Sequence, residues 1–145
     1  MSVEIPSAKN IIWTCCTLDG KNKEKEGNNT CPNHMFIVLT KKGYNERSRH
    51  FLAVPLSSIK IGNDEHENYY RLNYGINVGN DDIVNDDLNE FSLTKSTVVL
   101  CDRPTRVDKE DIEQTVNFGK IEDKKYEEII QAINHFLVSG TIQNK

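Results

Sequence analysis

The feature that most constrains the fold of this chain is a series of short β-rich segments that ends in one amphipathic helix. β-branched and aromatic residues suit a pleated sheet, whereas Gly, Asn and Pro interrupt it. A run of short strands of this kind is typical of a small barrel. We therefore predict a mainly β barrel whose strands cover residues 11–17, 35–40, 50–57, 97–101, 105–107 and 116–121, with an outer strand at 69–74.

The last predicted element is a helix from about residue 123 to residue 138. Asp123 is its expected N-cap, and Gly140 is expected to end it. Apolar residues recur at steps of three and four, so they share one face that must pack on the sheet. This stripe contains Tyr126, Ile129, Ile130, Ile133, Phe136 and Leu137, and we expect Ile129, Ile130, Ile133 and Phe136 to be buried.

The connections differ in length and charge. A chain of 145 residues corresponds to one domain, residues 1–145. Residues 18–33 contain Gly, Asn and Lys and show no hydrophobic periodicity. This segment is longer than a connection between two strands needs, which favours a functional loop. Residues 42–45 are expected to form a turn. Residues 75–95 are acidic and rich in Asn, and we interpret them as an insertion with a short turn or helix.

Composition limits the classes of protein that fit. The net charge of −4 argues against a protein that coats nucleic acid, although a local basic patch can still hold a short strand. No apolar run approaches the ~20 residues of a membrane span. The first residues do not form a signal peptide, so we expect a cytoplasmic protein. The cysteines at 15, 16, 31 and 101 are expected to be free thiols.

One polar cluster follows a β-branched strand. The run Thr97–Val99 leads directly to Asp102, Arg103 and Arg106, and Pro104 interrupts the strand within the cluster. Unpaired buried charge is costly, so these side chains suit a surface that holds an anion and moves a proton. The alternative interpretation is a charged turn between two strands.

The same residues carry a resemblance to a known family. The segment 98–109, which begins V-V-L-C-D-R-P-T-R-V-D, resembles the signature of the MazF/PemK toxins, the endoribonuclease halves of bacterial toxin–antitoxin pairs. It is most similar to the Kid/PemK branch, whose strand reads roughly V-V-x-C-D-Q-P-R-T-I-D. Weaker similarities follow in the same order as the family's strands and helix, and together they span about residues 10–138. They comprise residues 10–13, residues 31–32 with 35–40, residues 53–58, and residues 119–121 with the helix after them.

This resemblance implies an SH3-like β-barrel with a C-terminal helix. It also implies metal-independent, sequence-selective cleavage of single-stranded RNA with no cofactor, leaving a 2′,3′-cyclic phosphate and a 5′-hydroxyl. The implied assembly is a homodimer with an RNA groove near the dimer interface. A cognate antitoxin is expected to place an acidic tail in that groove.

The resemblance also assigns candidate catalytic residues. Asp102 matches an aspartate that acts in proton transfer, and Ser57 matches a threonine in the third strand. The family's arginines correspond to Leu100 in one branch and Cys31 in the other, so Arg103 or Arg106 would have to supply the cation. His34 is a candidate acid or base, with a solvent-facing loop histidine as the alternative. The expected RNA-binding residues are Arg106, Lys21, Lys23, Lys25 and Cys31.

Other functions stay open at this point. A barrel without catalysis would bind only RNA or a protein, and a related barrel toxin poisons DNA gyrase. Cys31 and His34 form half of a zinc pattern, but the vicinal Cys15 and Cys16 would chelate one tetrahedral ion badly. We therefore expect no metal site. The chain has no Gly-rich phosphate loop, esterase motif or zincin motif.

Overall fold

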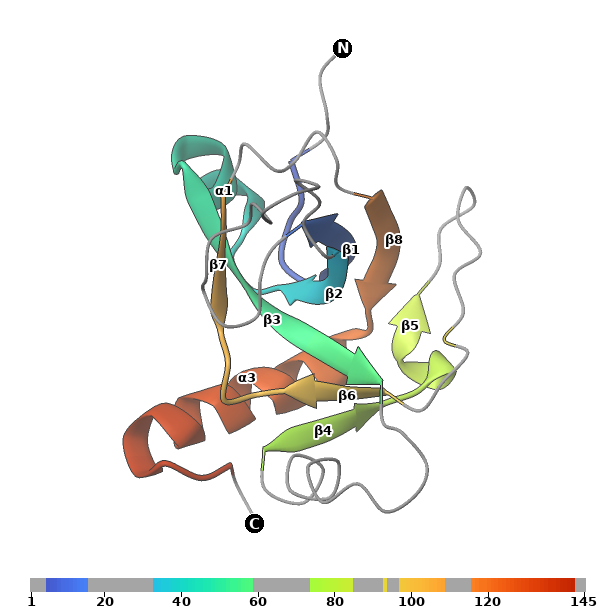
Figure 1. Cartoon of the computed structure of the whole chain (residues 1–145), viewed down its shortest axis with the longest axis vertical. Helices are drawn as coiled ribbons and strands as arrows, with labels where there is room; N and C mark the ends of the chain where they lie inside the picture. Colours follow the sequence, from blue (N-terminus) through green and yellow to red (C-terminus); the bar gives the residue numbers. More distant parts are fainter. Residues whose placement is uncertain are drawn as a thin grey trace, which may run out of the picture.

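A computed structural model describes residues 5–15, 33–58, 74–84, 93, 97–108 and 116–142 (Figure 1). The strands in this part of the chain are β1 (Asn10–Cys15), β2 (Asn33–Val38), β3 (His50–Ser58), β4 (Gly75–Val78), β5 (Ile83–Val84), β6 (Thr97–Leu100), β7 (Thr105–Asp108) and β8 (Val116–Ile121). The helical elements are α1 (Lys42–Arg47), the short 3₁₀ helix η1 (Asn80–Asp82) and α3 (Asp123–Ser139).

The strands form one sheet in which every described pairing is antiparallel. Its order is β4-β6-β3-β2-β1-β8-β5, and β7 also pairs with β3. The first half of β3 pairs with β7 and its second half with β6, so this long strand links the two ends of the segment that contains Asp102. The sheet curves into a half-barrel, and α3 lies across it (Figure 1). The predicted fold class is thus confirmed.

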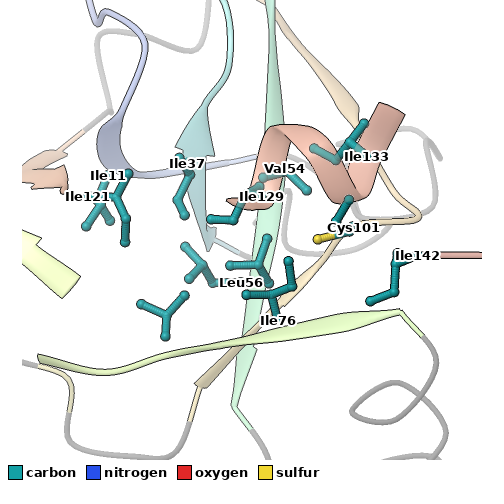
Figure 2. Close-up of a cluster of buried hydrophobic side chains, with 13 residues drawn as sticks. Ile11, Ile37, Val54, Leu56, Ile76, Cys101, Ile121, Ile129, Ile133 and Ile142 are labelled. Atoms are coloured by element: carbon teal, nitrogen blue, oxygen red, sulfur yellow. The ribbon is translucent and has the colours of Figure 1, made fainter. Parts of the chain in front are cut away.

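Apolar side chains fill both faces of the sheet. The larger cluster lies between the sheet and α3, where Ile129 and Ile133 meet Ile37, Val54 and Leu56 (Figure 2). A second cluster lies on the other face and contains Ile12, Phe36, Val38, Phe51, Ala53 and Val107. Burial on both faces explains why β2 and β3 are continuous apolar runs in the sequence rather than alternating ones.

The expected turn at 42–45 is wrong, because these residues begin helix α1. The reason is tertiary. Asn45 is fully buried, and its side-chain amide donates to the carbonyls of Pro6 (2.7 Å) and Thr40 (2.9 Å). Its side-chain oxygen accepts from the Thr40 hydroxyl (2.6 Å). These hydrogen bonds fix a helical turn that the sequence Lys-Gly-Tyr-Asn does not favour by itself.

The segment 75–95 contributes more to the sheet than its acidic composition indicates. Its described part contains the expected short helix, η1, but also strands β4 and β5, which we did not predict. β4 pairs with β6 and buries Ile76 and Val78. The expected strand at 69–74 lies outside the described residues except for Tyr74, which is in a turn.

Helix α3 has the expected extent but a different cap. Glu122, not Asp123, accepts hydrogen bonds from the amides of Lys124 (3.2 Å) and Lys125 (2.7 Å). Asp123 instead forms an ion pair with Lys9 (2.9 Å). Gly140 ends the helix with a left-handed φ of 82°, as expected.

The buried face of α3 is narrower than the predicted stripe. Ile129 and Ile133 are buried as expected, together with Ala132, whereas Ile130 and Phe136 are only partly buried. Leu137 is 67% exposed, whereas Ile142, beyond the turn at Gly140, belongs to the core. No described helix has the length and apolarity needed to cross a membrane.

Candidate active site

A short turn after β6 presents the polar cluster. All four residues of β6 are buried, and so is Cys101. The amide of Arg103 donates to the Leu100 carbonyl (3.1 Å), and the Thr105 hydroxyl donates to the Arg103 carbonyl (2.9 Å). Pro104 separates β6 from β7 as the sequence predicts. Asp102 and Arg103 therefore project from a turn that is fixed at both ends by the sheet.

The carboxyl group of Asp102 lies in an unfavourable environment for a charge. Its side chain is 17% exposed, and its Oδ1 atom is buried without a hydrogen-bond partner among the described residues. Arg103 Nε lies 3.9 Å from Oδ2, which is longer than the usual charge-assisted hydrogen bond of ~2.8 Å. Burial raises the pKa of Asp102, and its own backbone amide lowers the pKa by less. The protonated carboxyl is thus favoured more than in water.

This arrangement suits proton transfer beside an anion. A carboxyl group with a raised pKa holds a proton closer to neutral pH and can deliver it to a leaving oxygen. The Arg103 side chain is 35% exposed, so its guanidinium can reach both Asp102 and a phosphate in solution. The pair fits one acid and one cation of a phosphodiester-cleaving site.

Cys101 and Leu100, which precede Asp102, cannot supply a reactive group or a cation to this site. Burial raises the pKa of the Cys101 thiol to about 12, so Cys101 is neither a nucleophile nor a thiolate ligand at neutral pH. Leu100 is 3% exposed and packs with Val98 against Tyr74. The position that carries an arginine in the Kid/PemK branch therefore belongs here to an apolar cluster. Arg103 is the cation that the structure places beside Asp102.

Arg106 lies further along β7 with a carboxylate partner of its own. Its side chain is 64% exposed, and Nε is 3.3 Å from Asp108 Oδ1. The two residues are separated by one position on a strand, so their side chains share a face. This period-two spacing in the sequence Arg-Val-Asp was a signal for the pair that our sequence analysis did not use.

Ser57 and His34 lie on neighbouring strands. Ser57 is partly buried and opposes Val98 of β6, whereas His34 opposes Thr14 of β1. The pairing between β2 and β3 runs from Val38–Ala53 to Phe36–Pro55, so it ends two residues short of His34 and of Ser57. From Leu56 onward β3 pairs with β6. The side chain of His34 lies outside the described residues.

Asp102 lies at a different level from Ser57. It comes four residues after Val98, the partner of Ser57, and lies beyond the end of β6 in the following turn. The expected convergence of Asp102, Arg103, Ser57 and His34 on one phosphate stays a prediction.

The remaining candidates cannot be placed. Lys21, Lys23, Lys25 and Cys31 lie outside the described residues. Within the described ranges, no group of three or more His, Cys, Asp and Glu side chains could hold a metal ion. The burial of Asp102 Oδ1 could not be predicted from the local sequence, because it follows from the turn after β6.

Comparisons with known proteins agree with this fold. The structure of MazF from Deinococcus radiodurans superposes with a TM-score of 0.59 at 16% sequence identity, covering 93% of this chain and 98% of that one. A MazE–MazF complex from the same organism gives 0.57 at 16% identity, covering 92% and 96%. An endoribonuclease in complex with its cognate antitoxin from a mycobacterial species gives 0.56 at 12% identity, covering 92% and 96%.

The sequence comparisons are of two kinds. No curated protein matches this chain. A family profile, described as PemK-like, MazF-like toxin of type II toxin–antitoxin system, matches residues 10–137, which is most of the chain. This chain therefore belongs to the PemK-like, MazF-like toxin family.

Proposed function

We propose that this protein is the toxin of a type II toxin–antitoxin pair and acts as a metal-independent endoribonuclease on single-stranded RNA. The observation that carries the proposal is the Asp102–Arg103 pair, in which a partly buried carboxyl group with a raised pKa lies beside a partly exposed guanidinium. Membership of the toxin family supports the same function.

The proposed reaction is an internal transesterification. The 2′-oxygen of the RNA bonds to phosphorus while the bond from phosphorus to the 5′-oxygen breaks, which leaves a 2′,3′-cyclic phosphate and a 5′-hydroxyl. His34 accepts the proton of the 2′-hydroxyl, and protonated Asp102 gives its proton to the departing 5′-oxygen. Arg103 stabilises the charge that develops on the phosphoryl oxygens, and the Ser57 hydroxyl donates a hydrogen bond to them.

The assembly belongs to the same proposal. We expect a cytoplasmic homodimer whose RNA groove lies near the dimer interface, and a cognate antitoxin that occupies the groove with an acidic segment. Lys21, Lys23, Lys25, Cys31 and Arg106 are proposed to line the RNA path. The solved MazE–MazF complexes support an antitoxin partner for this fold.

One observation favours a second candidate function. Leu100 is buried in an apolar cluster, and Cys31 replaces the other branch's arginine, so neither family arginine is present in its usual place. A barrel that binds RNA or a protein without cleaving would need neither. Arg103 beside Asp102 supplies a nearby cation and is the reason that we prefer the enzyme.

Two substitutions distinguish these functions. Asp102→Asn keeps the side-chain shape but removes the transferable proton, so we expect cleavage to be lost while RNA affinity is kept or raised. Arg103→Ala should weaken both cleavage and binding, and should reduce the salt dependence of binding. RNA cleavage by Asp102→Asn at the wild-type rate would contradict the assigned role of Asp102.

A further inference from the structure

A strongly basic surface surrounds α1, and the site at Asp102 does not use it. Between Lys41 and Arg49 the chain carries four cations and one carboxylate, Glu46, for a net charge of +3 in a chain whose total is −4. All four cationic residues are exposed in the structure. We call this surface the α1 platform; it consists of Lys41, Lys42, Tyr44, Arg47 and Arg49.

The α1 platform adjoins the strand that leads to the candidate active site. α1 contacts β3. The amide of Leu52 donates to the Thr40 hydroxyl (3.2 Å), and the Leu52 carbonyl accepts from the Leu39 amide (2.8 Å). On its other side Leu52 opposes Arg106 of β7. The entry to α1 and Arg106 thus flank Leu52, which is an exposed residue of β3. Figure 1 shows α1 beside β3 and β7.

The distance between Arg106 and Asp102 is short enough for one RNA strand to contact both residues. Arg106 follows Asp102 by four residues, so their Cα atoms are at most ~14 Å apart. β7 therefore forms a direct path along the surface from the Asp102–Arg103 pair through Arg106 to the α1 platform. A strand of a few nucleotides spans this path.

The α1 platform is held rigidly. The buried Asn45 ties α1 to Pro6 and Thr40 through side-chain hydrogen bonds. Arg47 Nε donates to the Gly43 carbonyl (3.2 Å), which holds its guanidinium along the helix. Cations on a fixed element lose less entropy when they bind phosphates than cations on a flexible chain.

Tyr44 indicates which partner fits this surface. Its side chain is 49% exposed, and on the six-residue helix it stands three residues after Lys41 and three residues before Arg47. An aromatic ring among positive charges is typical of surfaces that bind single-stranded nucleic acid, where bases stack on the ring and cations contact the backbone. Charge complementarity alone would also suit an acidic peptide, but stacking requires a planar partner.

We propose that the α1 platform binds the backbone and one unpaired base of the same RNA strand whose scissile phosphate lies at Asp102. The inference rests on the proposed endoribonuclease function and extends it, because it makes the enzyme sensitive to RNA length beyond the cleaved dinucleotide. The contacts are to phosphates and to a base face, so this part of the recognition is independent of sequence.

The test compares RNA affinity between two double variants of the full chain. Lys42→Gln/Arg47→Gln removes two charges from the α1 platform. Lys120→Gln/Lys124→Gln removes the same charge from exposed positions on β8 and α3. The probe is a fluorescent 2′-O-methyl uridine 20-mer, which has no free 2′-hydroxyl to attack phosphorus. A dinucleotide of the same chemistry reports binding that does not span both surfaces.

Each phosphate contact contributes about 0.7 to the slope of log affinity against log salt for a single strand. We expect Lys42→Gln/Arg47→Gln to reduce that slope by about 1.4 and the 20-mer affinity at 0.1 M salt by roughly 25-fold. The affinity of this variant for the dinucleotide should change little, and so should the 20-mer affinity of the control variant. Equal losses in both double variants, or an unchanged 20-mer affinity, would overturn the inference; an unchanged affinity would favour a protein ligand for this surface.

Tyr44 gives an independent measurement. Tyr44→Ala should reduce 20-mer affinity by about 10-fold, and Tyr44→Phe should restore it, because stacking needs the ring and not the hydroxyl. Loss of affinity in both variants would refute the stacking role. If the wild type left RNA intact but bound the 20-mer through the α1 platform, the endoribonuclease function would fail while RNA binding by the platform would stand.

Discussion

Asp102 should reduce the stability of the folded protein at neutral pH. Its Oδ1 atom is buried without a partner among the described residues, and the nearest guanidinium nitrogen of Arg103 is 3.9 Å from Oδ2. Asp102→Asn keeps the shape of the side chain but removes the charge. We therefore expect this variant to be more stable than the wild type while it loses RNA cleavage, a trade-off common at functional residues.

The magnitude follows from the cost of an unsatisfied buried polar group, which is about 1–3 kcal/mol and greater for a charged group. Asparagine still buries a polar atom, so we expect a gain near the lower end, about 1 kcal/mol, or an increase in Tm of about 3 °C for a chain of this length.

The pH dependence has a definite sign. The pKa of Asp102 is raised in the folded state above its ordinary value of 3.8. Its destabilising effect is absent below the unfolded pKa, grows as pH rises towards the folded pKa, and is complete above it. The stability difference between Asp102→Asn and the wild type should therefore disappear at low pH.

Urea unfolding from pH 3 to pH 8 measures this difference. Asp123→Asn is a suitable control, because the ion pair with Lys9 lowers the pKa of Asp123. The stabilisation that Asp123 contributes through this ion pair is present above its unfolded pKa and is lost as pH falls. Asp123→Asn should therefore be no more stable than the wild type at pH 8. An Asp102→Asn protein that is less stable than the wild type at pH 8 would refute the reasoning.

Three further predictions concern the core and the α1 anchor. Ile129 is fully buried, so Ile129→Ala should lower the free energy of unfolding in urea titrations by about 2–5 kcal/mol. The exposed Leu137 is the control, and Leu137→Ala should change the free energy of unfolding by less than about 0.5 kcal/mol. Equal effects of the two substitutions would contradict the packing of α3. Asn45→Ala leaves the Pro6 carbonyl without its hydrogen bond and should cost about 1–3 kcal/mol in the same assay, so an unchanged Tm would be inconsistent with the anchor. Cys101 should react with iodoacetamide at pH 8 only after unfolding, since burial raises its pKa to about 12 in the folded state. Mass spectrometry locates the labelled cysteine, and rapid labelling of Cys101 in the native protein would contradict its burial.

Much of the sheet could be predicted from the sequence. Most residues in the apolar runs of β2, β3 and β6 are buried, so the composition of these runs alone distinguishes them from loops. β4 and β5 were missed because they are short and lie in an acidic segment, where burial of Ile76 depends on pairing with β6. α1 was missed because the hydrogen bonds of Asn45 that stabilise it come from residues outside the helix.

The residues of the candidate site stay a prediction from the sequence, and the geometry around Asp102 could not be predicted from it. Proximity of Asp102 and Arg103 follows from their adjacency in sequence. The buried Oδ1 atom and the raised pKa depend on the fold of the turn after β6, which no local pattern reports. The placement of Ser57 and His34 on neighbouring strands depends on the pairing of β2 with β3, which is a tertiary feature.

We propose above that this chain cleaves RNA without a metal ion. The most direct measurement incubates the purified wild-type protein with a long single-stranded RNA in EDTA and maps both new ends, with Asp102→Asn as the matched control. We expect discrete fragments that carry a 2′,3′-cyclic phosphate and a 5′-hydroxyl, and no fragments with the variant. Intact RNA at protein concentrations that saturate binding, or cleavage only when a divalent metal is added, would contradict the claim.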